Sequence, residues 1–221
     1  MLNPLRLMRA SLLLLLLISG LAKAAPPWNF ADFAAGDKLT YQTRADGRPR
    51  LHTFTFSESG PNGVKGTVEI GDHKMTFEAP AHGFLGREIC LAQLMTCEWT
   101  PPVKIFDRTL QVNDTWNTTT VVTTDKNITV DEVLEFKVER ADRVRVLAGE
   151  FDSLLVRTVG SINAKSDRGE VYKGTLQMRT WFGVVNKRLV LIKREYENSF
   201  RQTFTQELAK LPELADRKSV V

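Results

Sequence analysis

After the first thirty positions, apolar and polar residues alternate along most of the chain, and the spacing typical of a helix is rare. Alternation with a period of two predicts strands that bury one face. Segments rich in Gly, Pro, Asn and Asp separate the alternating runs and predict turns. The clearest alternating runs are 51–56, 67–70, 74–78, 117–124, 128–147, 151–162, 171–185 and 189–196.

This spacing of strands and turns is typical of successive hairpins. We therefore predict an all-β fold, an antiparallel meander of about nine to eleven strands that forms a barrel or an open half-barrel. At most one or two short helices are expected, over 88–95 and 204–211, and the second segment could equally be a final strand.

The N-terminus has the pattern of a secretory signal peptide. Arg6 and Arg9 precede an apolar run over 12–18, and small residues around Ala24 offer a cleavage site. The run is much shorter than the roughly 20 residues that span a bilayer. We predict that residues 1–24 are removed after Ala24. Residues 25–221 are then expected to form a single β-rich globular domain in the periplasm or outside the cell.

The predicted mature chain carries no signal for a membrane anchor. No cysteine lies near the cleavage site, so a lipid-modified N-terminus is not expected. Charged residues interrupt every later apolar run, so we expect no integral membrane segment after cleavage.

Cleavage also changes the charge of the chain. Arg6, Arg9 and Lys23 leave with the signal peptide, so the 30 basic residues become 27 against 26 acidic ones. A nearly neutral protein with interspersed charges does not attract nucleic acid at long range. We therefore expect no nucleic-acid partner.

Cys90 and Cys97 are the two cysteines of the chain. Disulfides persist in an oxidising compartment, so we expect these two to be bonded to each other. Seven residues of extended strand span about 23 Å, whereas bonded cysteines have Cα atoms within about 7 Å. The chain is therefore expected to reverse its direction within 91–96. The spacing is not that of a C-x-x-C redox pair, which favours a structural role.

No motif for a known chemistry stands out. Ser161 and Lys165 are too far apart for an S-x-x-K nucleophile, and no Gly-rich phosphate loop precedes a helix. We predict no metal site and no cofactor. An envelope hydrolase that uses carboxylate or histidine chemistry is the alternative to a non-catalytic protein. Its candidate residues are His52, His73, His82, Glu98, Asp107, Glu135 and Glu195.

Three short segments carry a resemblance to a known family. The segments 113–116, 148–151 and 181–182 read Asn-Asp-Thr-Trp, Ala-Gly-Glu-Phe and Trp-Phe. They resemble the G-x-x-W, A-G-x-F and late W-aromatic segments of the TapB-like periplasmic domain family of unknown function. The similarity spans about residues 33–205. Asn113 replaces the usual glycine, and no proline follows Phe182. The resemblance implies an all-β fold without a known activity.

The leading interpretation is a non-catalytic exported periplasmic protein. A curved sheet needs side chains or a ligand to fill its concave face, so we expect an apolar small molecule or a lipid as ligand. An envelope protein is the other expected partner, bound through a strand edge or an apolar patch. Trp116 and Trp181 are each expected to be either a core anchor or a platform on which a ligand stacks. The residues predicted to line the ligand site are Phe136, Phe151, Trp181 and Phe182.

Overall fold

The computed structural model describes residues 32–45, 47–60, 63–81, 83–90, 95–106 and 110–215. The predicted signal peptide lies outside these residues, as do His82 and Asp107. Nothing in the described residues is helical, so no helix among them is long and apolar enough to cross a membrane.

The described residues form twelve strands, because the alternating runs pair with their sequence neighbours as hairpins. The strands are β1 (Lys38–Ala45), β2 (Arg48–Gly60), β3 (Gly63–Ile70), β4 (His73–Ala79), β5 (Phe84–Cys90), β6 (Met95–Lys104), β7 (Thr115–Thr124), β8 (Thr129–Val146), β9 (Gly149–Lys165), β10 (Val171–Val185), β11 (Arg188–Asn198) and β12 (Thr203–Leu208).

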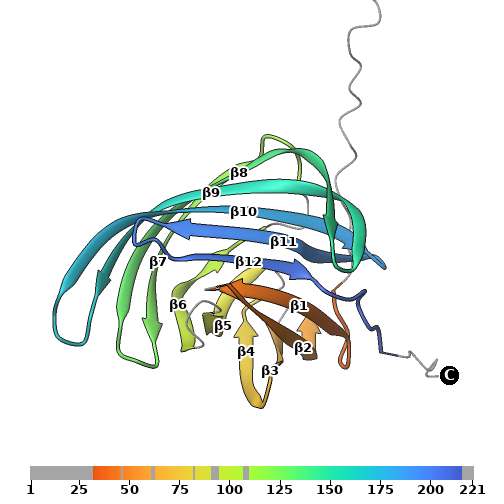
Figure 1. Cartoon of the computed structure of the whole chain (residues 1–221), viewed down its shortest axis with the longest axis horizontal. Helices are drawn as coiled ribbons and strands as arrows, with labels where there is room; N and C mark the ends of the chain where they lie inside the picture. Colours follow the sequence, from red (N-terminus) through yellow and green to blue (C-terminus); the bar gives the residue numbers. More distant parts are fainter. Residues whose placement is uncertain are drawn as a thin grey trace, which may run out of the picture.

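Each strand pairs antiparallel with the next, and β12 pairs with β1 to close the barrel (Figure 1). At the closing seam Tyr41 lies opposite Leu208. The predicted all-β meander and its closure into a barrel are confirmed, with one strand more than the predicted range. Closure pairs the edges that an open sheet would leave free.

Neither segment considered for a short helix is helical in its described residues. Glu88 and Cys90 belong to β5, and Met95 begins β6, whereas 91–94 lie outside the described residues. The described residues of 88–95 are therefore strand, within the prediction of at most one or two short helices. The second segment became β12, the strand that was the alternative interpretation.

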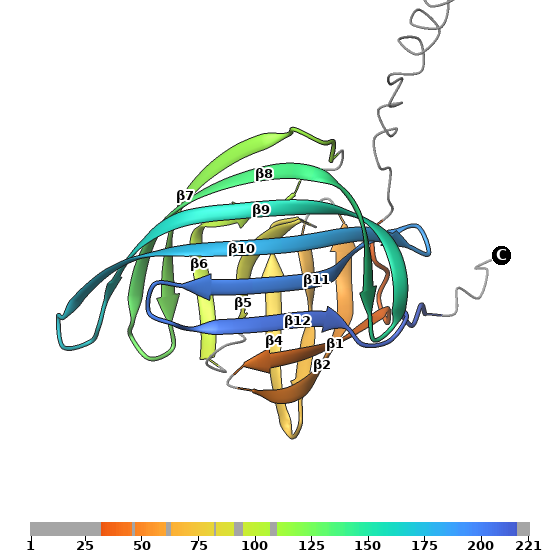
Figure 2. The same cartoon turned by 45° about the horizontal axis from the view of Figure 1, so that its top comes forward.

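The long hairpin of β8 and β9 bends past the ends of β10 and β11 (Figure 2). Its turn is fixed by a hydrogen bond from the Ala148 amide to the Leu208 carbonyl, at 3.0 Å. Gly149 has a φ of +136°, a conformation that glycine adopts without steric cost. Phe151 packs against the core just after this turn. Asn113 has a φ of +77°, a conformation that favours glycine and that asparagine tolerates better than most other residues.

Two large apolar clusters form the core. One contains Phe56 and Phe77 from the first strands together with Leu208, and the turn of the β8–β9 hairpin packs against it. The other gathers the inward side chains of β8 to β11, including Phe136, Val156 and Phe182. Trp116 stacks on Phe136 with ring centroids 5.0 Å apart and donates its indole N–H to the Lys104 carbonyl at 2.9 Å. Its stacking on a core residue fits the predicted anchoring role.

The two ends of the described chain meet at Asp37, whose side chain is buried. Its carboxylate accepts hydrogen bonds from the amides of Ala34 at 2.7 Å and Ala215 at 2.9 Å. The Arg188 guanidinium lies 3.6 Å from the same carboxylate and is also buried. This ion pair therefore ties β11 to both ends of the described chain.

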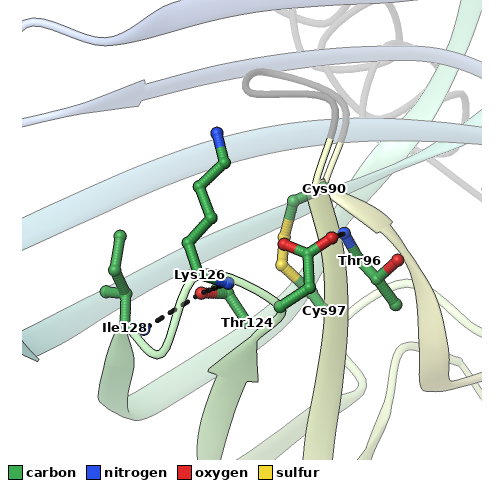
Figure 3. Close-up of a disulfide and its surroundings, with 7 residues drawn as sticks. Cys90, Thr96, Cys97, Thr124, Lys126 and Ile128 are labelled. Carbon is green, nitrogen blue, oxygen red and sulfur yellow. Dashed lines mark hydrogen bonds between the residues drawn. A yellow bond between two sulfur atoms is a disulfide. The ribbon is translucent and has the colours of Figure 1, made fainter. Parts of the chain in front are cut away.

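Cys90 and Cys97 form the predicted disulfide, with Cα atoms 5.7 Å apart (Figure 3). Cys90 lies at the end of β5, and Cys97 lies on β6 opposite Glu88. The neighbouring β7–β8 turn is tied to the same strand, because the Asp125 carboxylate accepts a hydrogen bond from the Thr96 amide at 3.1 Å. Within that turn Thr124 Oγ1 accepts from the Ile128 amide at 3.1 Å.

The double variant Cys90→Ser, Cys97→Ser is expected to fold and to lose about 2 to 3 kcal/mol of stability. On the chain-entropy model, a loop this short restrains the unfolded chain by about that amount. Urea unfolding followed by circular dichroism measures the loss. Two readily alkylated cysteines in native wild-type protein exported to the periplasm would contradict the pairing.

Candidate functional site: an apolar cavity inside the barrel

The barrel holds an internal cavity of about 550 Å³. Strands β5 to β12 supply its wall, and most of the side chains that face it are apolar. A pocket of this volume falls in the range of small-molecule sites. The apolar side chains of the wall include Leu85, Trp99, Val103, Ile105, Val122, Ile128, Val130, Leu134, Phe136, Ile162, Leu176, Met178, Phe200 and Phe204.

The alternation of β8 explains one side of the wall. Val130, Glu132, Leu134 and Phe136 are spaced by two residues, and all four line the cavity. In a strand such residues share one face. Their outward neighbours include the exposed Val133 and Glu135. The hydrophobic pattern that forms the strand therefore also forms the cavity.

Arg194 lies between this cavity and a smaller one of about 170 Å³. Leu85, Glu88 and Ile105 border both spaces with it. The smaller cavity is lined by aromatic residues of the first strands, including Phe54, Phe56 and Phe77. Arg194 and Glu88 therefore form a polar layer inside an otherwise largely apolar barrel.

Arg194 makes no ion pair and no side-chain hydrogen bond with any residue that the structure describes, and its Nε is buried without a partner. Burial lowers the pKa of the guanidinium, and the nearby Glu88 and Tyr41 oppose this shift. An arginine nevertheless stays protonated in proteins. The barrel thus contains a partly buried cation with no described carboxylate in hydrogen-bond contact.

Glu88 is the carboxylate that interacts electrostatically with Arg194. Burial raises the pKa of Glu88 to about 7, and the Arg194 charge opposes the rise. The group is therefore only partly ionised near neutral pH and compensates Arg194 incompletely. Burial also raises the pKa of the Tyr41 hydroxyl, so this residue stays neutral at the same pH.

Glu132 forms a second polar position in the cavity wall. Burial raises its pKa to about 7, and a hydrogen bond from Trp99 offsets part of the rise. Burial likewise raises the pKa of Tyr196, and the hydroxyl accepts a hydrogen bond from the Asn198 amide group at 3.1 Å. These groups add polar atoms to the wall without adding a cation.

The hairpin turns at one end of the barrel border the cavity. Ile128, Ser166 and Phe200 belong to three such turns and line it, and the disulfide between β5 and β6 also lines it. Tyr172 and Phe200 also line the cavity and are exposed. We refer to this end, defined by Ile128, Ser166, Tyr172 and Phe200, as the mouth.

The structure places the four predicted ligand-lining residues in different surroundings. Phe136 lies in the wall of the main cavity, and Phe182 lies in the wall of the smaller one. Phe151 and Trp181 line neither space and pack into the first core cluster instead. Contact of these residues with a ligand stays a prediction.

Trp181 is held by polar groups at the edge of that cluster. Its indole N–H donates to the Asp142 carboxylate at 3.0 Å, and the Lys193 ammonium lies 5.2 Å from its ring centroid. The Trp181 hydrogen bond lowers the pKa of Asp142. Trp181 is buried, and these contacts fit a core anchor.

The candidate catalytic residues do not converge in the part of the chain that the structure describes. His52 is buried at 0% exposure and neither ring nitrogen has a hydrogen-bond partner there, whereas His73 is exposed. Glu98 and Glu135 are exposed, and Glu195 pairs with Arg179 at 2.6 Å. His82 and Asp107 lie outside the described residues. No cluster of three or more potential metal ligands occurs among the described residues.

The sequence interpretation did not select Arg194, Glu88 or Glu132. Glu132 carried a usable signal, because it occupies the apolar phase of the β8 alternation. Glu88 and Arg194 carried no such signal. Register irregularities in the β5–β6 and β10–β11 pairs change the phase of pairing near Glu88 and Arg194, so alternation alone could not show which way their side chains point.

A groove of about 670 Å³ over β8 to β12 and the end of β1 is a less suitable site. Four of its charged residues already pair with one another, in the Arg179–Glu195 pair at 2.6 Å and the Arg157–Glu139 pair at 4.0 Å. Exposed pairs of this kind are common on protein surfaces. The internal cavity, with an unpaired cation, is the better candidate.

Comparison with known proteins shows the fold alone. A protein from Bacteroides fragilis, described as exported with a YmcC-like fold, matches with a TM-score of 0.51 and 14% identity over 84% of this chain and 99% of that one. A protein described as a lipoprotein from Parabacteroides distasonis matches with a TM-score of 0.50 and 11% identity over 86% of this chain and 100% of that one. No family model and no curated protein matches the chain. Membership of the TapB-like family stays a prediction.

Proposed function

We propose that this protein is a non-catalytic ligand-binding protein of the bacterial periplasm that holds an apolar or lipid-like molecule inside its barrel. The observation that carries the proposal is the internal cavity of about 550 Å³ with a mainly apolar wall. Binding is favourable when an apolar ligand displaces water from an apolar wall of this kind.

The signal peptide pattern supports the location, and so do the descriptions of the two proteins of similar fold as an exported protein and a lipoprotein. The TapB-like resemblance is compatible with this proposal, because that family has no known activity. The hydrolase alternative lacks a comparable observation, since its described candidate residues do not meet in one space.

Two measurements test the proposal. Native mass spectrometry of protein purified from periplasm is expected to show a bound hydrophobic molecule that organic solvent extracts. The neutral fluorophore N-phenylnaphthylamine is expected to bind the emptied protein and to become fluorescent. A ligand-free species that also fails to bind the fluorophore would contradict the proposal.

A variant that fills the cavity tests whether the fluorophore binds inside the barrel. Ala164 lines the cavity on β9, and Ser161 lies exposed on the same strand. Ala164→Trp is expected to weaken fluorophore binding at least about tenfold, because the indole occupies the ligand space. The matched variant Ser161→Trp adds the same side chain outside the barrel and should bind as wild type does. Equal binding by both variants would place the fluorophore elsewhere.

A further inference from the structure

Arg194 is the only cation among the described residues of the main cavity wall. The Nε of its guanidinium is buried without a hydrogen-bond partner, and no described carboxylate lies within ion-pair distance. A buried charge without a partner is costly, and an anion in contact with it recovers part of that cost. The arrangement therefore favours a ligand that brings its own negative charge.

The charge of the wall limits how many charges the ligand carries. Glu88 and Glu132 both line the cavity with Arg194, and no second cation accompanies it among the described wall residues. A dianion such as a phosphate monoester would meet one cation and two acids. A single carboxylate matches one guanidinium, which can bind both of its oxygens at once.

We propose that the ligand is an amphiphile of the fatty-acid class, with one anionic head group bound to Arg194 and an apolar chain that extends toward the mouth. This inference rests on the proposed function. The chain would pass the apolar side chains of Leu176, Met178 and Phe204, which line the cavity with Arg194. The head group would lie deep in the barrel, because Arg194 also borders the smaller cavity beyond.

A pair of fluorophores distinguishes the contribution of the anionic head group to binding from that of the apolar body. Anilinonaphthalene sulfonate and N-phenylnaphthylamine share the same rings and differ by one sulfonate. Wild-type protein is expected to bind both, and the anionic one more tightly. Arg194→Met is expected to weaken binding of the anionic probe at least about 30-fold and to change the affinity for the neutral probe less than about threefold. Arg194→Lys keeps a charge and should retain part of the anionic preference.

Arg179→Met is the matched control, because Arg179 lies on the neighbouring strand and is exposed. Circular dichroism of each variant verifies the fold, and the neutral probe verifies that the cavity is intact. The same comparison is then made with palmitate and hexadecanol as competitors. Palmitate should displace the neutral probe from wild type at a lower concentration than hexadecanol does. The two competitors should displace it from Arg194→Met at equal concentrations.

The outcomes distinguish the two proposals. If Arg194→Met keeps wild-type affinity for the anionic probe, or if palmitate and hexadecanol compete equally with wild type, the head-group inference is wrong and the apolar site stands. If wild type binds neither probe, the proposed function fails and this inference fails with it.

Discussion

Replacing Asp37 with alanine is expected to destabilise the protein by about 3 to 5 kcal/mol. The carboxylate is buried, accepts hydrogen bonds from the Ala34 and Ala215 amides, and lies 3.6 Å from the Arg188 guanidinium. The substitution leaves the arginine buried without its counter-charge and leaves two amides without their acceptor. Urea unfolding followed by circular dichroism measures the loss.

Companion variants show which part of the loss comes from the uncompensated charge. The double variant Asp37→Ala, Arg188→Met should recover part of the stability, because both charges are then absent. Lys74→Ala is the exposed control, since its pair with Glu69 at 3.0 Å lies on the surface and should contribute less than about 1 kcal/mol. A loss below about 1 kcal/mol for Asp37→Ala would show that this cluster does not hold the chain ends.

Much of the fold follows from local pattern. Runs such as 128–147 and 171–185 alternate cleanly, and they became β8 and β10 with nearly the predicted bounds. Strand β5 was less evident from the sequence, because it does not alternate cleanly and pairs with β6 in an irregular register. Pairing between strands is not visible in one segment of sequence.

The candidate site was less predictable than the fold. An aromatic residue on a half-buried strand can face either the core or a cavity, and the pattern does not distinguish these. Phe136 faced the cavity, whereas Trp181 packed into the core beside a bulge that separates it from Phe182 in register. The hydrogen bond from the Ala215 amide to the Asp37 carboxylate joins residues 178 positions apart, a separation at which local pattern gives no information.

Replacing Glu88 or Glu132 with glutamine is expected to change the free energy of unfolding more favourably at pH 8 than at pH 5. Burial raises the pKa of both carboxyls to about 7, from ordinary values of 4.5. Between these values the unfolded chain binds fewer protons than the folded one, so the free energy of unfolding falls as pH rises. Such a shift corresponds to about 3 kcal/mol per group, which solvent in the cavity reduces to about 2 kcal/mol.

His52 acts in the opposite direction and cancels from this comparison. Burial, aided by the Arg50 charge, lowers the pKa of His52 to about 4, so its contribution to stability grows as pH rises toward its ordinary value of 6.5. Because His52 is present in wild type and in each variant, the difference between them isolates the carboxyls. Urea unfolding of wild type, Glu88→Gln and Glu132→Gln at both pH values gives that difference.

Glu98→Gln is the matched control, because Glu98 is exposed on β6 and its replacement should change stability equally at the two pH values. Equal effects of the cavity variants at pH 5 and pH 8 would show that neither carboxyl is desolvated. The expected result has a further consequence for the Arg194 layer. A protonated Glu88 leaves the guanidinium uncompensated, so the pH range that stabilises the empty barrel is also the range in which Arg194 most favours an anion.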